Sequence, residues 1–229
     1  MKRWLLTMGV TLLMAGCAAS TAPENTPETD TNTTMEEPPD MDLQGNRFRP
    51  LTWDEMTDAQ KTMVAHILEG PRGGLGGPFN VLLRSPEMGD MAQELGAYAR
   101  ITSSLPGNLR ELAIVMTARF WRSDFEWYAH KAAALRERVD AGVVDAIARG
   151  DRPEAMTDEE TVVYNLVQEL LYDRRASDAT FNAAVEALGE RGVVDVVGTV
   201  GYYGLVSLVL NVDEYPLPEG ATPELEPLP

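Results

Sequence analysis

The stretch from Val193 to Leu210 restricts the fold more than any other part of the chain. Its only polar side chains are those of Asp195, Thr199, Tyr202, Tyr203 and Ser207. A helix that is apolar on every side must be buried, either inside a protein or in a membrane. A charged residue within the stretch and acidic residues on both sides disfavour a membrane span. We therefore expect a central helix, in which Gly198, Gly201 and Gly204 let neighbouring helices approach closely.

The rest of the chain shows helical rather than strand periodicity. No segment alternates polar and apolar residues between hairpin turns, as a half-buried strand does. Capping signals precede three segments, at Thr52–Glu55, Ser85–Glu87 and Thr157–Glu160. The pattern predicts helices at about 53–68, 86–102, 109–120, 123–138, 140–149, 157–172, 177–188 and 192–211. The sequence thus predicts an all-α domain, a compact bundle of about six to eight helices.

A glycine-rich segment, residues 70–78, interrupts this pattern after the first predicted helix. It lacks the Lys-Ser/Thr pair of a phosphate-binding loop, and no strand precedes it. We expect a flexible loop at the edge of a pocket.

Residues 1–17 have the pattern of a secretion signal. The basic residues Lys2 and Arg3 precede an apolar segment that is too short to span a bilayer. The segment ends in Leu13–Cys17, which resembles a bacterial lipobox, whose cysteine is acylated and becomes the mature N-terminus. We expect a lipid on Cys17 to anchor the protein on the periplasmic side, at the outer membrane because no aspartate follows the cysteine. The alternative is an ordinary signal peptide with a cysteine placed by chance.

Composition sets the other boundaries. Residues 18–46 are rich in Thr, Pro, Glu, Asp and Asn, and such a segment buries too little apolar surface to offset its chain entropy. We expect it to be a disordered acidic tether. Residues 47–214 form the predicted helical domain, and residues 215–229 form a Pro/Glu-rich tail that we expect to be loose.

Charge and cysteine content exclude several classes of function. The net charge of −17 disfavours binding to nucleic acid, because the phosphate backbone is recognised by basic surfaces. The single cysteine, Cys17, excludes an intrachain disulfide and a zinc site built from several thiolates.

The segment from Ser123 to His130 carries the candidate chemistry. Ser123, Glu126 and His130 are spaced i, i+3 and i+7, so a helix presents all three on one face. Trp127 lies beside them, and Glu111 belongs to the preceding predicted helix. These residues form the candidate site.

Five segments around this site carry a family resemblance. They are Gly77–Pro86, Arg110–Ile114, Arg119–Trp121, Phe125–His130 and Arg191–Asp195. Together they resemble the carboxymuconolactone decarboxylase-like family, which includes the alkyl hydroperoxidase D-type proteins, over about Leu51 to Val212. The resemblance implies an all-helical, alkyl hydroperoxidase D-like fold that assembles into trimers or hexamers.

The hydroperoxidase branch of this family uses a glutamate, a Cys-x-x-Cys pair and a histidine. The glutamate and the histidine correspond to Glu111 and His130, but Ser123 and Glu126 stand at the two cysteine positions. Thiol–disulfide chemistry needs two thiols, so we expect no peroxidase activity.

The decarboxylase branch implies loss of a carboxylate from a lactone, with a proton delivered to carbon and no metal or organic cofactor. His130 is then the proton donor or acceptor, Glu126 its orienting or shuttling partner, and Glu111 a second acid or base. Ser123 supplies a hydroxyl nucleophile or, alternatively, only caps the helix.

Four further residues are predicted to bind the small carboxylated substrate. Arg119 and Arg122 would hold the carboxylate with their planar guanidinium groups, and Trp127 and Tyr128 would wall the pocket and exclude water.

A non-catalytic reading of the same residues stays open. Glu126 and His130 form an i,i+4 pair that by itself stabilises a helix by about 0.2–0.5 kcal/mol. Trp127 fits a core or a subunit interface equally well. A metal site at Glu111, Glu126 and His130 is a further alternative, which the pattern supports less because only one of these three residues is a histidine. The alternative function is a binding or scaffolding lipoprotein, and an enclosed pocket at His130 would favour the enzyme instead.

Overall fold

The computed structural model describes residues 36, 38 and 41–227. All regular structure in this part of the chain is helical, and it contains no β-strand, so the predicted all-α class is confirmed. The predicted signal peptide, Cys17 and most of the predicted tether lie outside the described residues.

The elements follow one another in a simple order. The α-helices are α1 (Asp58–Glu69), α2 (Phe79–Leu82), α3 (Pro86–Ala97), α4 (Gly107–Trp121), α5 (Asp124–Arg136), α6 (Ala141–Arg149), α7 (Asp158–Gln168) and α8 (Asp178–Asp213). A 3-10 turn, η1 (Trp53–Glu55), precedes α1. The π-helical turns η2 (Tyr98–Thr102) and η3 (Glu169–Asp173) extend α3 and α7.

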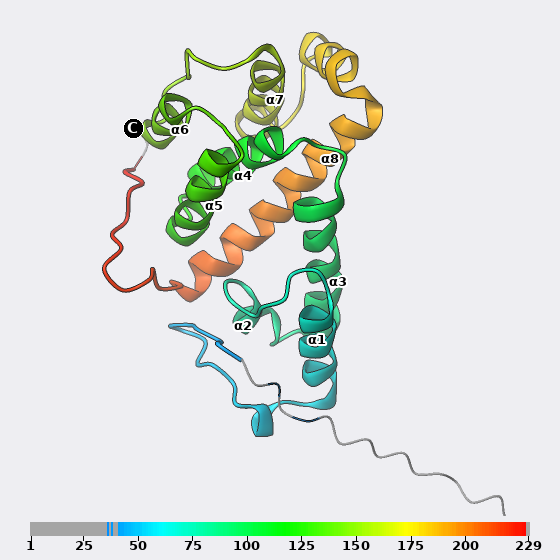
Figure 1. Cartoon of the computed structure of the whole chain (residues 1–229), viewed down its shortest axis with the longest axis vertical. Helices are drawn as coiled ribbons and strands as arrows, with labels where there is room; N and C mark the ends of the chain where they lie inside the picture. Colours follow the sequence, from blue (N-terminus) through cyan, green and yellow to red (C-terminus); the bar gives the residue numbers. More distant parts are fainter. Residues whose placement is uncertain (1–35, 37, 39–40, 228–229) are drawn as a thin grey trace, which may run out of the picture. The chain divides into compact units, whose positions relative to one another are not determined.

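Helix α8 is the central element. Figure 1 shows it crossing the domain between α4 and α5 on one side and α3 on the other, and it packs against all three. Among the described residues it is the one helix long and apolar enough to span a membrane, and 61% of its most apolar window is buried in the domain. The buried carboxylate of Asp195 accepts hydrogen bonds from the Tyr98 hydroxyl and the Ser104 amide. These bonds explain how an acidic residue is accommodated in the apolar run.

Three predicted helix boundaries need correction. The expected helix 53–68 is divided, because Met56 is extended and Thr57 opens a second capping box with Gln60. The expected helices 177–188 and 192–211 form one element that is kinked at Gly189, where φ is 70°. The helix expected from residue 109 begins at Gly107, and the Asn108 side chain in its first turn donates to Glu160 of α7.

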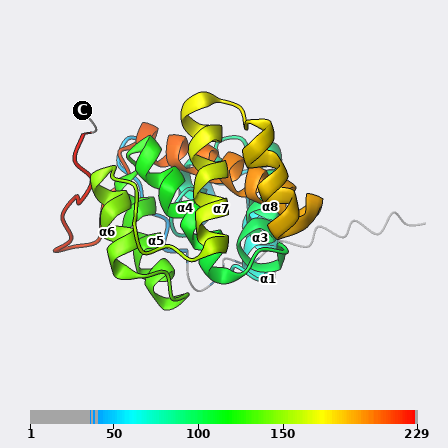
Figure 2. The same ribbon diagram turned by 90° about the horizontal axis from the view of Figure 1, so that it is seen from above.

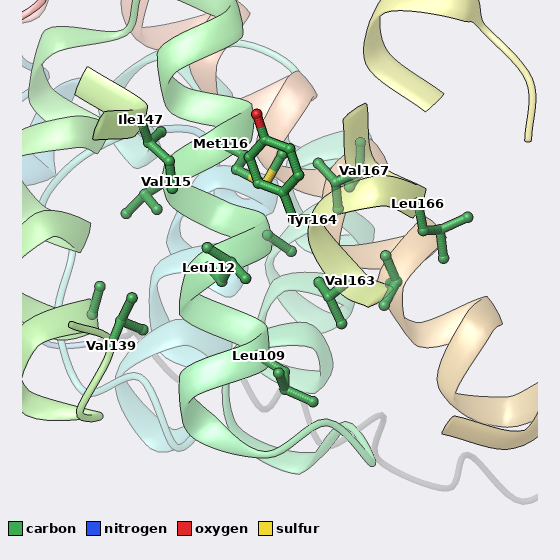
Figure 3. Packing of buried hydrophobic residues seen from close by; sticks show 14 of the residues in the cluster. Leu109, Leu112, Val115, Met116, Val139, Ile147, Val163, Tyr164, Leu166 and Val167 are labelled. Atoms are coloured by element: carbon green, nitrogen blue, oxygen red, sulfur yellow. The ribbon is translucent and has the colours of Figure 1, made fainter. Parts of the chain in front are cut away.

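The largest apolar cluster surrounds α4. Figure 2 shows α4 between α5 and α7, with α6 beyond α5. Figure 3 shows Leu112 and Met116 of α4 facing Val163 and Tyr164 of α7, with Ile147 of α6 on another side. A helix packed on so many sides has no polar face, so any charged residue of α4 that is buried requires a partner.

Both ends of the predicted domain extend further than expected. Leu43 belongs to a second apolar cluster around α1 and α2, so the folded part begins within the predicted tether. The prediction of a loose tail does not hold at Glu224 and Leu225. Leu225 is buried in the main cluster, and Glu224 pairs with Lys131 of α5. One buried apolar side chain, the ion pair of Glu224 and the hydrogen bond from Arg122 to the Leu225 carbonyl hold this segment against the domain, although its composition is that of a linker.

Candidate functional site

Helices α4 and α5 bring the predicted acid and base groups together. Only Arg122 and Ser123 connect the two helices, and Arg122 adopts a left-handed conformation with φ 49°. This tight connection folds α5 back along α4, and the two helices pack against each other. As a result Glu111 of α4 meets Glu126 and His130 of α5 inside the domain.

His130 lies between the two glutamates. Its Nδ1 is 2.6 Å from Oε2 of Glu111, and its Nε2 is 3.5 Å from Oε2 of Glu126. The side chains of Glu111 and His130 are only 5% and 6% exposed. An ionised carboxylate can only accept, so an ionised Glu111 requires the proton on Nδ1, and the Nε2 of a neutral imidazole then presents its lone pair toward Glu126. Glu111 therefore fixes the tautomer and the orientation of the ring.

Glu126 is a buried carboxyl without a hydrogen-bond partner on Oε2. Burial raises its pKa, and the charge that a protonated His130 would carry and the charges of Arg100 and Arg72 oppose the rise. Glu126 thus holds its proton more tightly than an exposed glutamate does. A raised pKa keeps the neutral, proton-donating form of the carboxyl populated at a higher pH than in an exposed glutamate.

Glu126 and His130 line a pocket of about 220 Å³. The pocket is lined by Arg72, Gly76, Gly77, Pro78, Arg100, Phe125, Glu126, Ala129, His130, Tyr202, Tyr203 and Val206. Two cationic side chains are part of this lining: Arg72 belongs to the glycine-rich loop 70–78, and Arg100 belongs to η2. The Arg72 guanidinium donates to the Tyr202 hydroxyl over 2.9 Å and lies over the Phe79 ring. The predicted loop does lie at the edge of a pocket.

Two tyrosines of α8 complete the pocket. Tyr203 meets the His130 ring edge-on, with centroids 4.9 Å apart, and Tyr202 packs against Tyr203. Burial raises the pKa of Tyr203 well above its ordinary value. The phenol is therefore protonated at neutral pH, and its hydroxyl can donate a hydrogen bond. Helix α3 approaches Tyr202 closely, because a Cβ on Gly96 would lie 2.1 Å from the Tyr202 hydroxyl oxygen. Glycine at this position is needed for the tyrosine to occupy the pocket.

None of the four predicted substrate-binding residues lines the His130 pocket. Arg119 is buried elsewhere, in a pocket between α4 and α7. The Arg122 Nε donates to the Leu225 carbonyl, and the Trp127 indole is in the main core and donates to Glu224. Tyr128 is exposed. The docked tail and the left-handed turn at Arg122 redirect these side chains, and neither feature is visible in helical spacing.

Ser123 also lies away from the His130 pocket. Its side chain is fully buried, makes no capping hydrogen bond and has no hydrogen-bond partner on Oγ. It lines a different cavity, together with Asp124 and the tail. The three residues predicted to share one helix face therefore do not share one pocket. Glu126 and His130 line the His130 pocket together with Arg72 and Arg100, and Ser123 lines the other cavity.

Sequence reasoning missed Arg72, Arg100, Tyr202 and Tyr203. The signals available were the arginine within the glycine-rich loop and two adjacent tyrosines in an otherwise apolar helix. These segments are far apart in the chain, and only the tertiary packing of the loop, η2 and α8 brings them together.

Among the described residues, no group of three or more histidine, cysteine, aspartate or glutamate side chains is arranged to hold a metal ion. No protein-family model matches the chain, and no curated protein shows significant similarity to it.

Proposed function

We propose that the protein is a carboxymuconolactone decarboxylase-like enzyme that transfers protons on a small carboxylated substrate without an organic cofactor. The observation that carries the proposal is the placement of His130 between Glu111 and Glu126, at a pocket that two arginines also line. This arrangement combines an oriented base, a carboxyl with a raised pKa and cationic groups for an anion in one small space.

Arg72 and Arg100 would hold the substrate carboxylate. A guanidinium group binds a carboxylate through two parallel hydrogen bonds, and the two side chains provide the local positive charge in a chain of net charge −17. A ligand pocket for a drug-sized molecule is usually about 300–1,000 Å³. The smaller volume here, about 220 Å³, favours a small molecule such as a lactone or a short carboxylic acid.

The protein groups then perform acid–base chemistry at carbon. In a decarboxylation, the bond from carbon to the carboxyl group breaks, carbon dioxide leaves, and the electron pair forms an enolate. The protonated carboxyl of Glu126 or the imidazole of His130 then delivers a proton to carbon. The tyrosine hydroxyls can donate to the enolate oxygen, because burial keeps them protonated. Glu111 does not line the pocket, so its role is to position His130.

A turnover screen tests this proposal. Lactone carboxylates and 3-oxo carboxylates are incubated with the protein, carbon dioxide release is measured, and deuterium uptake at carbon is followed by NMR in D₂O. Replacing a general acid–base group lowers the rate by about 10²–10⁴-fold, which is the effect expected for His130→Gln. His66→Gln is the matched control, because His66 is the other histidine and does not line the His130 pocket. Turnover that persists unchanged in His130→Gln would contradict the proposal.

We also propose that the chain self-associates into a trimer or hexamer. Helix α8 exposes Val194, Val197, Leu208 and Val212, and exposed apolar groups on one element support a protein–protein contact. Light scattering coupled to size-exclusion chromatography measures the mass in solution, and a monomer at micromolar concentration would contradict this proposal.

Lipid anchoring in the periplasm remains a prediction from the first 17 residues. Incorporation of labelled palmitate into the wild type but not into Cys17→Ser is the expected result. Equal labelling of the two proteins would remove Cys17 as the lipidation site.

A further inference from the structure

Phe125 lines two spaces, the His130 pocket and a second cavity, and it is the one residue that the two linings share. The second cavity has a volume of about 500 Å³, more than twice the roughly 220 Å³ of the His130 pocket. One half-buried side chain thus forms the shared wall between the two.

The ring of Phe125 is held in place by a contact network from outside α5. It meets the Tyr215 ring at an angle of 64°, with centroids 4.5 Å apart. The Tyr215 hydroxyl accepts the Gly77 amide over 3.1 Å, which ties this pair to the glycine-rich loop. Gly77 has φ 78°, a conformation that favours glycine, and the position of a Cβ there would be 3.6 Å from the Phe125 ring. The wall is therefore an aromatic pair fastened to the loop that also carries Arg72.

The second cavity is suited to the polar end of a longer molecule. Oγ of Ser123 and Oδ1 of Asp124 are buried there without hydrogen-bond partners. Leu217 and Pro223 of the tail form another part of its lining, and the buried Leu225 anchors the end of this segment. The cavity offers apolar walls, the carboxyl groups of Asp124 and Glu214 and other hydrogen-bonding groups, but no arginine or lysine. It is suited to a hydroxyl or amide group that donates hydrogen bonds rather than to a second carboxylate.

We propose that Phe125 determines substrate length: its ring confines ligands of the His130 pocket to single-ring carboxylates and closes the pocket off from the Ser123 cavity. This inference rests on the proposed function, because it takes the carboxylate end of the ligand to be held by Arg72 and Arg100. With the ring removed, the two spaces become continuous and a ligand with a second ring can extend toward Ser123.

Binding to the full chain tests the inference without requiring turnover. The probes are benzoate and biphenyl-4-carboxylate, with benzyl alcohol and 4-biphenylmethanol as their uncharged counterparts, and affinities are measured by calorimetry. In Phe125→Ala the affinity for the biphenyl probes should rise by at least about tenfold, the effect of burying one more ring. The affinity for the single-ring probes should change by less than about threefold. Phe181→Ala, which removes an exposed phenylalanine of α8 that lines neither cavity, should leave all affinities unchanged.

Two further variants protect the test against misfolding. Phe125→Leu shortens the ring while keeping an apolar side chain, and Tyr215→Phe removes only the hydrogen bond to Gly77. Both should shift the preference toward the biphenyl probes in the same direction, by a smaller factor. Circular dichroism and thermal melting confirm that each protein is folded.

The outcomes separate this inference from the proposed function. A biphenyl-to-single-ring affinity ratio that is the same in the wild type and all Phe125 and Tyr215 variants overturns the role of Phe125. If the ratio shifts as expected but carboxylates bind no better than alcohols, the role of Phe125 stands and the anion-binding part of the proposed function is wrong. If no probe binds either the wild type or the variants, both are refuted.

Discussion

Replacing Glu111 with glutamine tests whether the His130 network is organised as its geometry indicates. The side chain keeps its shape, but the bond of 2.6 Å between Oε2 and the His130 Nδ1 loses its charge. Hydrogen bonds to charged groups contribute about 1.5–3 kcal/mol and neutral ones about 0.5–1.5 kcal/mol. The difference, roughly 1–2 kcal/mol, is the expected loss in the free energy of unfolding.

The expected loss is large enough to measure. For a domain of about 150–250 residues, 1 kcal/mol corresponds to a shift in Tm of about 2–4 °C, so Glu111→Gln should lower Tm by roughly 2–8 °C. The pair of His66 and Asp90 is the control, because its Nδ1–Oδ2 distance is 2.7 Å but the two side chains are 48% and 26% exposed. An exposed pair contributes about 0–1 kcal/mol, so Asp90→Asn should lower Tm by less.

NMR reports the same network directly. The chain has two histidines, so the ¹⁵N resonances of the two imidazole rings can be assigned by comparison with His66→Gln. We expect the wild-type His130 ring in the tautomer protonated at Nδ1, and a mixture of tautomers in Glu111→Gln, because the amide of glutamine can present either its oxygen or its nitrogen. An Nε2-protonated His130 in the wild type, or equal Tm losses in Glu111→Gln and Asp90→Asn, would refute this reasoning.

Three further substitutions test other parts of the structure. Because the folded-state pKa of Glu126 is raised, ionisation of this one group should cost stability as the pH rises above about 4.5, the ordinary value for glutamate. Thermal melts at a series of pH values should therefore show that the Tm of Glu126→Gln rises relative to that of the wild type above this pH. Below this pH the difference in Tm between the two proteins should stay constant. Leu225→Ala should lower the free energy of unfolding by about 2–5 kcal/mol in urea titrations, and Leu217→Ala, in the half-buried part of the tail, by clearly less. Asp213→Ala should speed hydrogen exchange at the amides of residues 46 and 48, whose acceptor it removes, without a matching change in α7.

The helices were predictable because their signals are local. The apolar run Val193–Leu210 predicted the C-terminal half of α8, and the capping box at Thr157 predicted the start of α7. Errors occurred where a second local signal competed with the first. Thr57 forms its own capping box five residues after Thr52 and separates η1 from α1, and Gly189 kinks α8 without ending it.

The site was predictable only in part, for a physical reason. Helical spacing and the family resemblance brought Glu111, Glu126 and His130 together, and the structure places all three in one network. Arg72 and Arg100 join them through packing between distant segments, which no short-range period encodes. The predicted Arg119 and Arg122 are close in sequence to the site, but Arg119 of α4 lines another pocket and Arg122, in the connection to α5, donates to the Leu225 carbonyl.

The composition of the His130 network itself argues for a functional rather than a structural role. Two buried carboxyl groups beside one imidazole are expensive to desolvate, and apolar side chains of similar volume at such positions usually stabilise a fold equally well or better. Oε2 of Glu126 has no hydrogen-bond partner among the described residues and lies 3.5 Å from Nε2 of His130. Its burial raises the pKa of Glu126 at the wall of a pocket that Arg72 and Arg100 also line. An incompletely satisfied acid that faces a cavity with cationic groups is the arrangement expected where a ligand supplies the missing hydrogen bond, and this supports the enzyme over the scaffold.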